Sequence, residues 1–215
     1  MMKYDGSMHD NFSIAWFKLA ECVNRGEKER AFAMHRLLAH SINDPALVFQ
    51  LEGDIALACK DTARAVEAYK KAALKYSELN QLDQTAAVYE HLFYLLPNDF
   101  FICENLVTLF QRKKNSSKLI EYFPHFLNFL SLKSDEATLI STTENYADTL
   151  EKEIIVTFYE DILYASWLDH GFEGLKKYLV EQIMLHYLAE NDDTGLEQWK
   201  DRLAVLRPDL IRYTQ

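Results

Sequence analysis

Hydrophobic residues recur at every third or fourth position along most of this chain, which is the spacing of an amphipathic helix. Capping residues and helix breakers divide the pattern into separate segments. The predicted helices span residues 10–24, 27–40, 45–59, 62–80, 82–96, 99–113, 116–130, 135–150, 154–167, 172–190 and 194–206. The connections between them are short, so neighbouring helices are expected to pack antiparallel.

Two helix boundaries carry a chemical signal of their own. Asp44 is a capping residue placed before a proline, Pro45, that favours the first turn of a helix, and Pro97 ends one helix where Asp99 caps the next. Only six Gly and four Pro occur in 215 residues, which leaves little material for the turns of a β fold. The predicted fold is therefore all-α: an antiparallel helix-pair array, or α-solenoid, of about eleven helices.

Two segments of the pattern repeat at an interval of 34 residues. Ala31 and Ala65 occupy the same place in two helix-turn-helix units, and 34 residues is the period of the tetratricopeptide repeat. Gly53, Tyr69 and Ala72 also fit the repeat, so the second unit resembles this family well, whereas the first is degenerate. The resemblance implies a superhelix of helix pairs, in which small residues let helices approach closely, and a role as a protein-interaction scaffold.

The resemblance weakens along the chain. Tyr69 and Tyr89 are only 20 residues apart, so the helix predicted over residues 62–80 is expected to pair with both the preceding and the following helix. We predict tetratricopeptide-like repeats over residues 1–131 and an acidic C-terminal helical part over residues 132–215. That second part either continues the array as a cap or forms a separate bundle.

The resemblance also implies a partner-binding groove, lined by the first helix of each pair. In this register the groove residues are Trp16, Asn24, Gln50, Asp54 and Leu57. The family's grip on a terminal carboxylate needs Lys and Asn, and the corresponding positions here include Trp16 and Asp54. An acidic tail is therefore disfavoured as the ligand. Trp16 is the natural anchor for a partner, and its burial against the next unit is an equal alternative.

A second candidate surface lies in the C-terminal part. Tyr159 and Tyr164 stand beside Glu160 and Asp161, and aromatic residues next to acidic ones suit a protein-binding patch. Such a patch would belong to a structural subunit that docks into a larger assembly. Core packing is the competing interpretation for the aromatic residues of this segment. It is also the expectation for the helix over residues 116–130, which is apolar on more than one side and carries Pro124, a site for a kink or restart near Tyr122.

The formal net charge of −10 is unevenly distributed. Residues 1–131 hold 15 Lys and Arg against 16 Asp and Glu, whereas residues 132–215 hold 8 against 17. An acidic surplus repels nucleic acid and anionic lipid, so a protein or peptide partner is expected, with no nucleic acid and no membrane. A solvated face that maintains solubility also accounts for many of these carboxylates. No apolar run approaches the roughly 18–20 residues of a membrane span, and the first residues lack a secretory core, which predicts a cytoplasmic protein.

The sequence contains little that indicates catalysis. Its seven His are dispersed, and no metalloprotease, nucleophile-elbow or phosphate-loop motif occurs. Cys22, Cys59 and Cys103 lie far apart among apolar residues, which is typical of small core residues rather than of a metal site. We therefore expect no enzymatic activity and no cofactor or metal. An enzyme whose site is assembled from dispersed residues is the weaker alternative.

Overall fold

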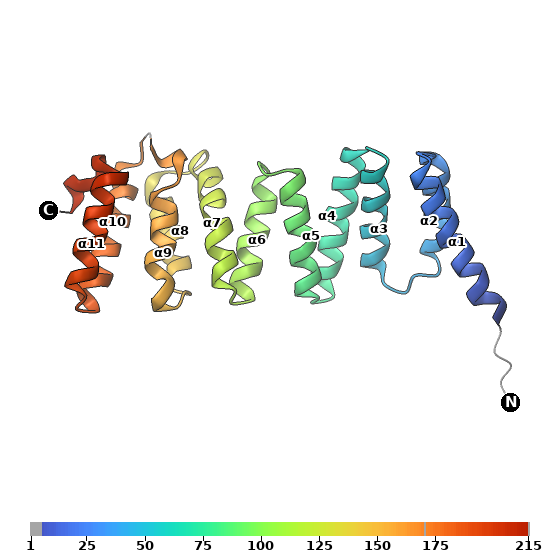
Figure 1. The fold of residues 1–215 in the computed structure, drawn as a ribbon, viewed down its shortest axis with the longest axis horizontal. Coiled ribbons are helices and arrows are strands. Elements are labelled where there is room, and N and C mark those ends of the chain that lie inside the picture. The colour runs from blue at the N-terminus through green and yellow to red at the C-terminus, as the bar shows by residue number, and fades with distance from the viewer. Residues whose placement is uncertain (1–5, 170, 215) are drawn as a thin grey trace, which may run out of the picture. The chain divides into compact units, whose positions relative to one another are not determined.

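The computed structural model describes the backbone of residues 6–169 and 171–214, and the side chains of these ranges from residue 14 onward. Within them the chain forms eleven α-helices, two short 3₁₀ helices and no strand, which confirms the all-α prediction (Figure 1). The helices are α1 (Gly6–Asn24), α2 (Lys28–Ala39), α3 (Pro45–Ala58), α4 (Thr62–Glu78), α5 (Leu82–Leu95), α6 (Phe100–Arg112), α7 (Ser116–Ser131), α8 (Glu136–Ala147), α9 (Lys152–Leu163), η1 (Ser166–Asp169), α10 (Glu173–Ala189), α11 (Asp193–Leu206) and η2 (Pro208–Tyr213).

The helices belong to two compact units, one ending at Ile102 and the other beginning at Cys103. In the first unit each helix packs against the next, from α1 through α5. In the second unit α7 contacts α8 and α9, and α10 contacts α8, α9, α11 and η2. The predicted limit of the repeats at residue 131 concerns a different property, the extent of the family resemblance, and stays a prediction.

The helices of the first unit cross on small residues. Ala31, Ala65 and Ala72 are completely buried, and a Cβ atom added to Gly53 would lie 2.6 Å from Cε1 of Tyr69. The ring of Tyr69 therefore lies directly against the α3 backbone, where no side chain larger than hydrogen fits. The close approach predicted at Gly53 is confirmed, and so is the pairing of α4 with both α3 and α5.

One type of turn closes five of the helices. In each, a residue with positive φ follows the helix, and the next backbone N–H donates to the carbonyl five residues earlier, at 2.8–3.0 Å. The positive-φ residues are Gly26, Lys60, Asn80, Lys114 and Asn191. The following side chain often caps the next helix, as Asp61 does by accepting from the N–H of Arg64. The intervals from residue 26 to 60 and from 80 to 114 are both 34 residues.

Aromatic rings fill the centre of the second unit. Phe123 on α7 is completely buried, and its ring centroid lies 5.0 Å from that of Tyr146 on α8 and 4.8 Å from that of Phe158 on α9. The predicted burial of the α7 helix is confirmed. The restart predicted near Tyr122 is wrong, because α7 runs through Pro124 without interruption. The helix predicted over residues 154–167 is also too long, since α9 ends at Leu163 and η1 turns Leu168 into the core.

Candidate functional site

The first unit contains two adjacent hollows that share Asp54. The α1–α3 hollow has a volume of about 350 Å³ and is lined by Trp16, Leu19, Ala20, Val23, Asn24, Leu51, Asp54, Ile55 and Ala58. The α3–α5 hollow has a volume of about 310 Å³ and is lined by Gln50, Asp54, Tyr69, Gln84, Ala87, Val88 and His91. We refer to the two together as the groove.

Helical periodicity explains why these residues share one surface. On α5 the lining residues Gln84, Ala87, Val88 and His91 are spaced by three or four positions, so they form one stripe along the helix. The lining residues of α1 and α3 follow the same spacing. The groove therefore consists of parallel stripes from α1, α3 and α5, with Tyr69 of α4 between the last two.

Two tyrosines of α4 fix the polar side chains of α3. The Tyr69 hydroxyl donates to Oδ1 of Asp54 at 2.6 Å, and the Tyr76 hydroxyl donates to Oε1 of Gln50 at 2.8 Å. Burial raises the pKa of both phenols, and the nearby Asp54 carboxylate raises it further. Both hydroxyls consequently remain protonated at neutral pH and act as permanent donors, so Asp54 and Gln50 are held in place before any partner arrives.

The two hollows differ in chemistry. The α1–α3 hollow has apolar walls, among them Leu19, Val23 and Leu51, with the half-buried Trp16 at its side. The α3–α5 hollow has a polar rim, and the exposed ring of His91 packs edge-on against Tyr69 with a centroid distance of 4.8 Å. The groove thus offers an apolar cavity next to fixed hydrogen-bonding groups, which is the composition of a surface that binds a polypeptide.

The structure brings most of the predicted groove residues together. Trp16, Asn24 and Asp54 line the α1–α3 hollow, and Gln50 lines the α3–α5 hollow. Leu57 is half-buried on α3 and is not among the lining residues of either hollow. Complete burial, the alternative for Trp16, is not observed, because its side chain remains partly exposed.

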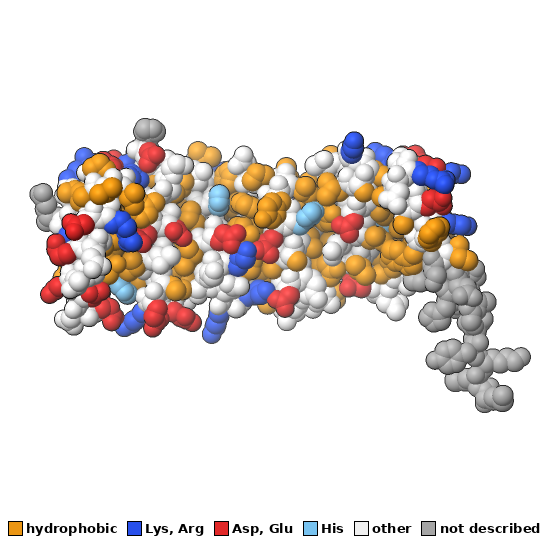
Figure 2. All heavy atoms as spheres, viewed as in Figure 1, with side chains coloured by type: hydrophobic (Ala, Val, Ile, Leu, Met, Phe, Trp, Pro, Cys, Tyr) orange, Lys and Arg blue, Asp and Glu red, His pale blue; other side chains and the backbone are white. Residues whose placement is uncertain are grey.

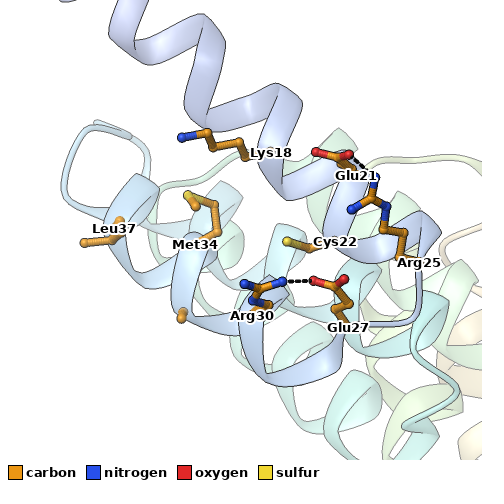
Figure 3. Close-up of a pocket in the computed structure, with 9 residues that line it drawn as sticks. Lys18, Glu21, Cys22, Arg25, Glu27, Arg30, Met34 and Leu37 are labelled. Atoms are coloured by element: carbon orange, nitrogen blue, oxygen red, sulfur yellow. Dashed lines mark hydrogen bonds and ion pairs between the residues drawn. The ribbon is translucent and has the colours of Figure 1, made fainter.

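A third hollow, of about 400 Å³, was missed by the sequence reasoning. It lies between α1 and α2, where Figure 3 shows Lys18, Cys22 and Met34 around it. Its residues on α1 fall on the side opposite Trp16, at 100° per residue. Its charges compensate one another locally: Arg25 pairs with Glu21 at 2.6 Å and Arg30 with Glu27 at 2.8 Å, and the Arg30 hydrogen bond lowers the pKa of Glu27. The charged spacing along α1 was the available signal.

The two tyrosines predicted for a C-terminal patch lie mainly inside the second unit. Tyr159 is only 5% exposed, with its ring against Phe158 and Tyr178, so it is a core residue. Tyr164 is half-buried, and its hydroxyl is buried without a hydrogen-bond partner among the residues described. The aromatic residues of α9 were apolar on several sides because the helix has neighbours on several sides.

Charged residues around Tyr164 are engaged with each other. Glu160 pairs with Arg202, and burial raises the pKa of Glu160 although the guanidinium opposes that shift. Figure 2 shows further acidic side chains along the lower rim of the C-terminal helices.

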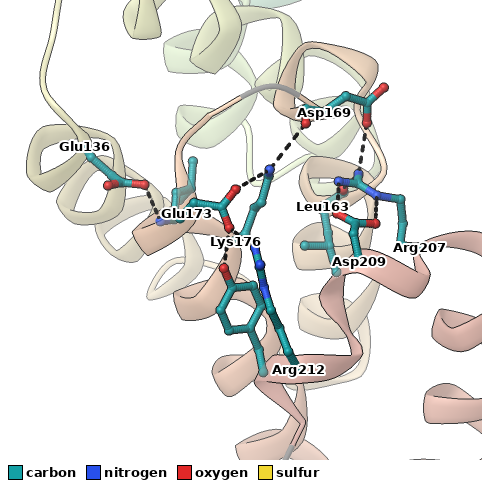
Figure 4. Close-up of polar contacts among 10 residues, drawn as sticks. Glu136, Leu163, Asp169, Glu173, Lys176, Arg207, Asp209 and Arg212 are labelled. Carbon is teal, nitrogen blue, oxygen red and sulfur yellow. Dashed lines mark hydrogen bonds and ion pairs between the residues drawn. The ribbon is translucent and has the colours of Figure 1, made fainter.

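A polar network attaches the C-terminal 3₁₀ helix η2 to the second unit (Figure 4). Arg207 donates to the carbonyl of Leu163 at 2.9 Å and pairs with Asp169 and Asp209. Glu173 accepts hydrogen bonds from Tyr213, from the buried Lys176 and from Arg212. The Tyr213 hydroxyl is the main cause that lowers the pKa of Glu173 to about 2, followed by Lys176. These charges serve to hold the fold together.

Within the described ranges, no group of three or more His, Cys, Asp or Glu is placed to hold a metal ion. No helix of that part of the chain has the length and apolar character needed to cross a membrane. The chain matches no protein-family model, and no curated protein matches its sequence.

Proposed function

We propose that this chain is a non-catalytic cytoplasmic scaffold or adaptor that binds a segment of a partner protein in the groove formed by α1, α3 and α5. The main support is the convergence of Trp16 and Asn24 with Asp54 on one open hollow, next to the polar rim at Gln50. A partly exposed tryptophan rimmed by polar groups is a common form of binding anchor.

We further propose that the first unit consists of tetratricopeptide-like repeats. Two observations support this proposal: the identical turns 34 residues apart, and the close packing of Tyr69 on Gly53. The turns after Asn80 and Lys114 extend that interval beyond the two units in which the residue pattern is clear. In such repeats the first helices of successive pairs line the binding face, as α1 and α3 do here.

The proposal is tested by capture of partners from a cell extract on the immobilised chain. Trp16→Ala should abolish capture, whereas Phe17→Ala should not, because Phe17 is 73% exposed on α1 and lines neither hollow. Trp16 is only half-buried, so its replacement should cost less than the about 3–5 kcal/mol expected for a fully buried tryptophan. Equal capture by a folded Trp16→Ala variant would move the site away from the groove.

A second candidate function, docking of a structural subunit through its C-terminal helices, is favoured by one observation. The last two helices expose apolar side chains, with Val205 80% and Leu206 57% exposed on α11, and Leu185 57% and Leu188 50% exposed on α10. Under this alternative, Val205→Glu would abolish capture of the partner and Trp16→Ala would leave it intact.

A further inference from the structure

Asp54 introduces an uncompensated charge into the groove. It belongs to both hollows, and neither hollow is lined by a Lys or Arg among the described residues. Three basic side chains of α2 and α4 are paired elsewhere. Arg64 bonds Glu52 at 2.7 Å and covers the Phe32 ring, Lys28 pairs with Asp61 at 2.8 Å, and Lys70 pairs with Asp99 at 3.0 Å.

The Asp54 carboxylate is also held in a defined position. Its Oδ1 accepts the Tyr69 hydroxyl at 2.6 Å, and Tyr69 is wedged between the α3 backbone at Gly53 and the ring of His91. Its Oδ2 accepts no hydrogen bond from the residues that the structure describes, and the side chain is exposed. A fixed carboxylate oxygen that faces solvent is a pre-organised acceptor for a cationic donor.

We infer, on the basis of the proposed function, that the groove selects a peptide segment with a Lys or Arg side chain at Asp54 and an adjacent apolar side chain in the α1–α3 hollow. The cation supplies the charge and the donor that Oδ2 lacks, while Trp16 and Leu51 contact the apolar side chain. An acidic segment at the same place would meet the Asp54 charge without any compensating cation.

Selection from a random twelve-residue peptide library displayed on phage, with the full chain as bait, identifies such segments. The enriched peptides should combine Lys or Arg with a neighbouring Leu, Ile, Phe or Trp. The best peptide is then synthesised, together with a version whose cationic residues are replaced by Gln. The affinity of each is measured by fluorescence anisotropy against the parent chain, Asp54→Asn and Glu67→Gln. Glu67 is the matched control, since it is an exposed carboxylate on α4 outside both hollows.

Asp54→Asn keeps the shape of the side chain and an oxygen for Tyr69, so its melting temperature should equal that of the parent. We expect it to weaken binding of the cationic peptide about tenfold and to leave the Gln version unaffected, because one charge-assisted contact is lost. Glu67→Gln should change neither affinity.

The possible failures separate the two proposals. Enriched peptides that depend on Trp16 but are acidic or uncharged, and that bind Asp54→Asn as well as the parent, would overturn the inferred charge preference and leave the groove as the binding site. A selection that enriches no peptide, or only peptides that bind Trp16→Ala equally well, would overturn the proposed function and this inference together.

Discussion

The helices of the first unit cross on small residues, whereas those of the second unit are separated by aromatic rings. Ala31, Ala65, Ala72 and Gly53 are buried at the contacts of the first unit, and Phe123 is buried among Tyr146 and Phe158 in the second. Small residues bring helix backbones together and leave hollows beside the contact, while large rings fill the space between helices. This difference places the open groove in the first unit.

The two units also use their charged residues differently. In the second unit Glu173, Arg207 and Asp209 hold η2 in place, so their charges are satisfied internally. In the groove of the first unit, Asp54 has one oxygen bonded to Tyr69 and the other directed to solvent. Paired charges are typical of structural roles, and a fixed carboxylate in an open hollow is typical of recognition.

The largest expected effect concerns the aromatic core. Phe123→Ala should lower the free energy of unfolding by about 3–5 kcal/mol, because it opens a cavity among packed rings. Leu132→Ala is the control on the turn that ends the same helix, where Leu132 is 76% exposed, and it should change stability by less than about 0.5 kcal/mol. Urea unfolding followed by circular dichroism measures both, and similar small losses would contradict an aromatic-supported second unit.

The contacts of the first unit should respond in the opposite sense, to enlargement instead of truncation. Ala65→Leu should overpack a helix contact and cost about 1–3 kcal/mol. Ala63→Leu makes the same change at an exposed position of α4 and should be nearly neutral. Thermal unfolding compares the two variants. An Ala65→Leu variant as stable as the parent would show that close helix contact is not what packs this unit.

The smallest expected effect is the acid dependence of the η2 anchor. Because the pKa of Glu173 is lowered from 4.5 to about 2, its contribution to stability is present above pH 4.5 and is lost as the pH falls toward 2. Its side chain is half exposed, so Glu173→Gln should cost at most about 1 kcal/mol at neutral pH. The difference from the parent should shrink in unfolding experiments between pH 7 and 3. The control Glu144→Gln, at an exposed site on α8, should show no such trend, and a constant difference for Glu173→Gln would refute the assignment.

Much of the architecture could be predicted because its signals are local. The cap at Asp44 before Pro45 and the apolar periodicity placed α3 within one residue of its observed end, and Asp99 caps α6 as expected, accepting from the N–H of Ile102. The short η1 and η2 helices were not predicted, because they depend on distant contacts such as the Arg207 bond to the Leu163 carbonyl.

The groove could be predicted only in part. Trp16, Asn24, Gln50 and Asp54 followed from the repeat register, but the contribution of α5 did not, because the register was lost after Tyr76. The repeated turns would have preserved it. They went unnoticed because four of the five positive-φ residues are Lys or Asn instead of glycine. The Tyr69 bond to Asp54 depends on how closely two helices approach, which residue types alone do not specify.

The most direct test of the groove uses the indole N–H signals of the three tryptophans, Trp16, Trp167 and Trp199, in the nitrogen-15 NMR spectrum of the whole chain. When the phage-selected peptide is added, we predict that the Trp16 signal shifts in proportion to occupancy. The signal of Trp199, buried in the second unit, should stay in place. A peptide that binds without moving the Trp16 signal, or that shifts Trp167 or Trp199 instead, would contradict the assignment of partner binding to the groove.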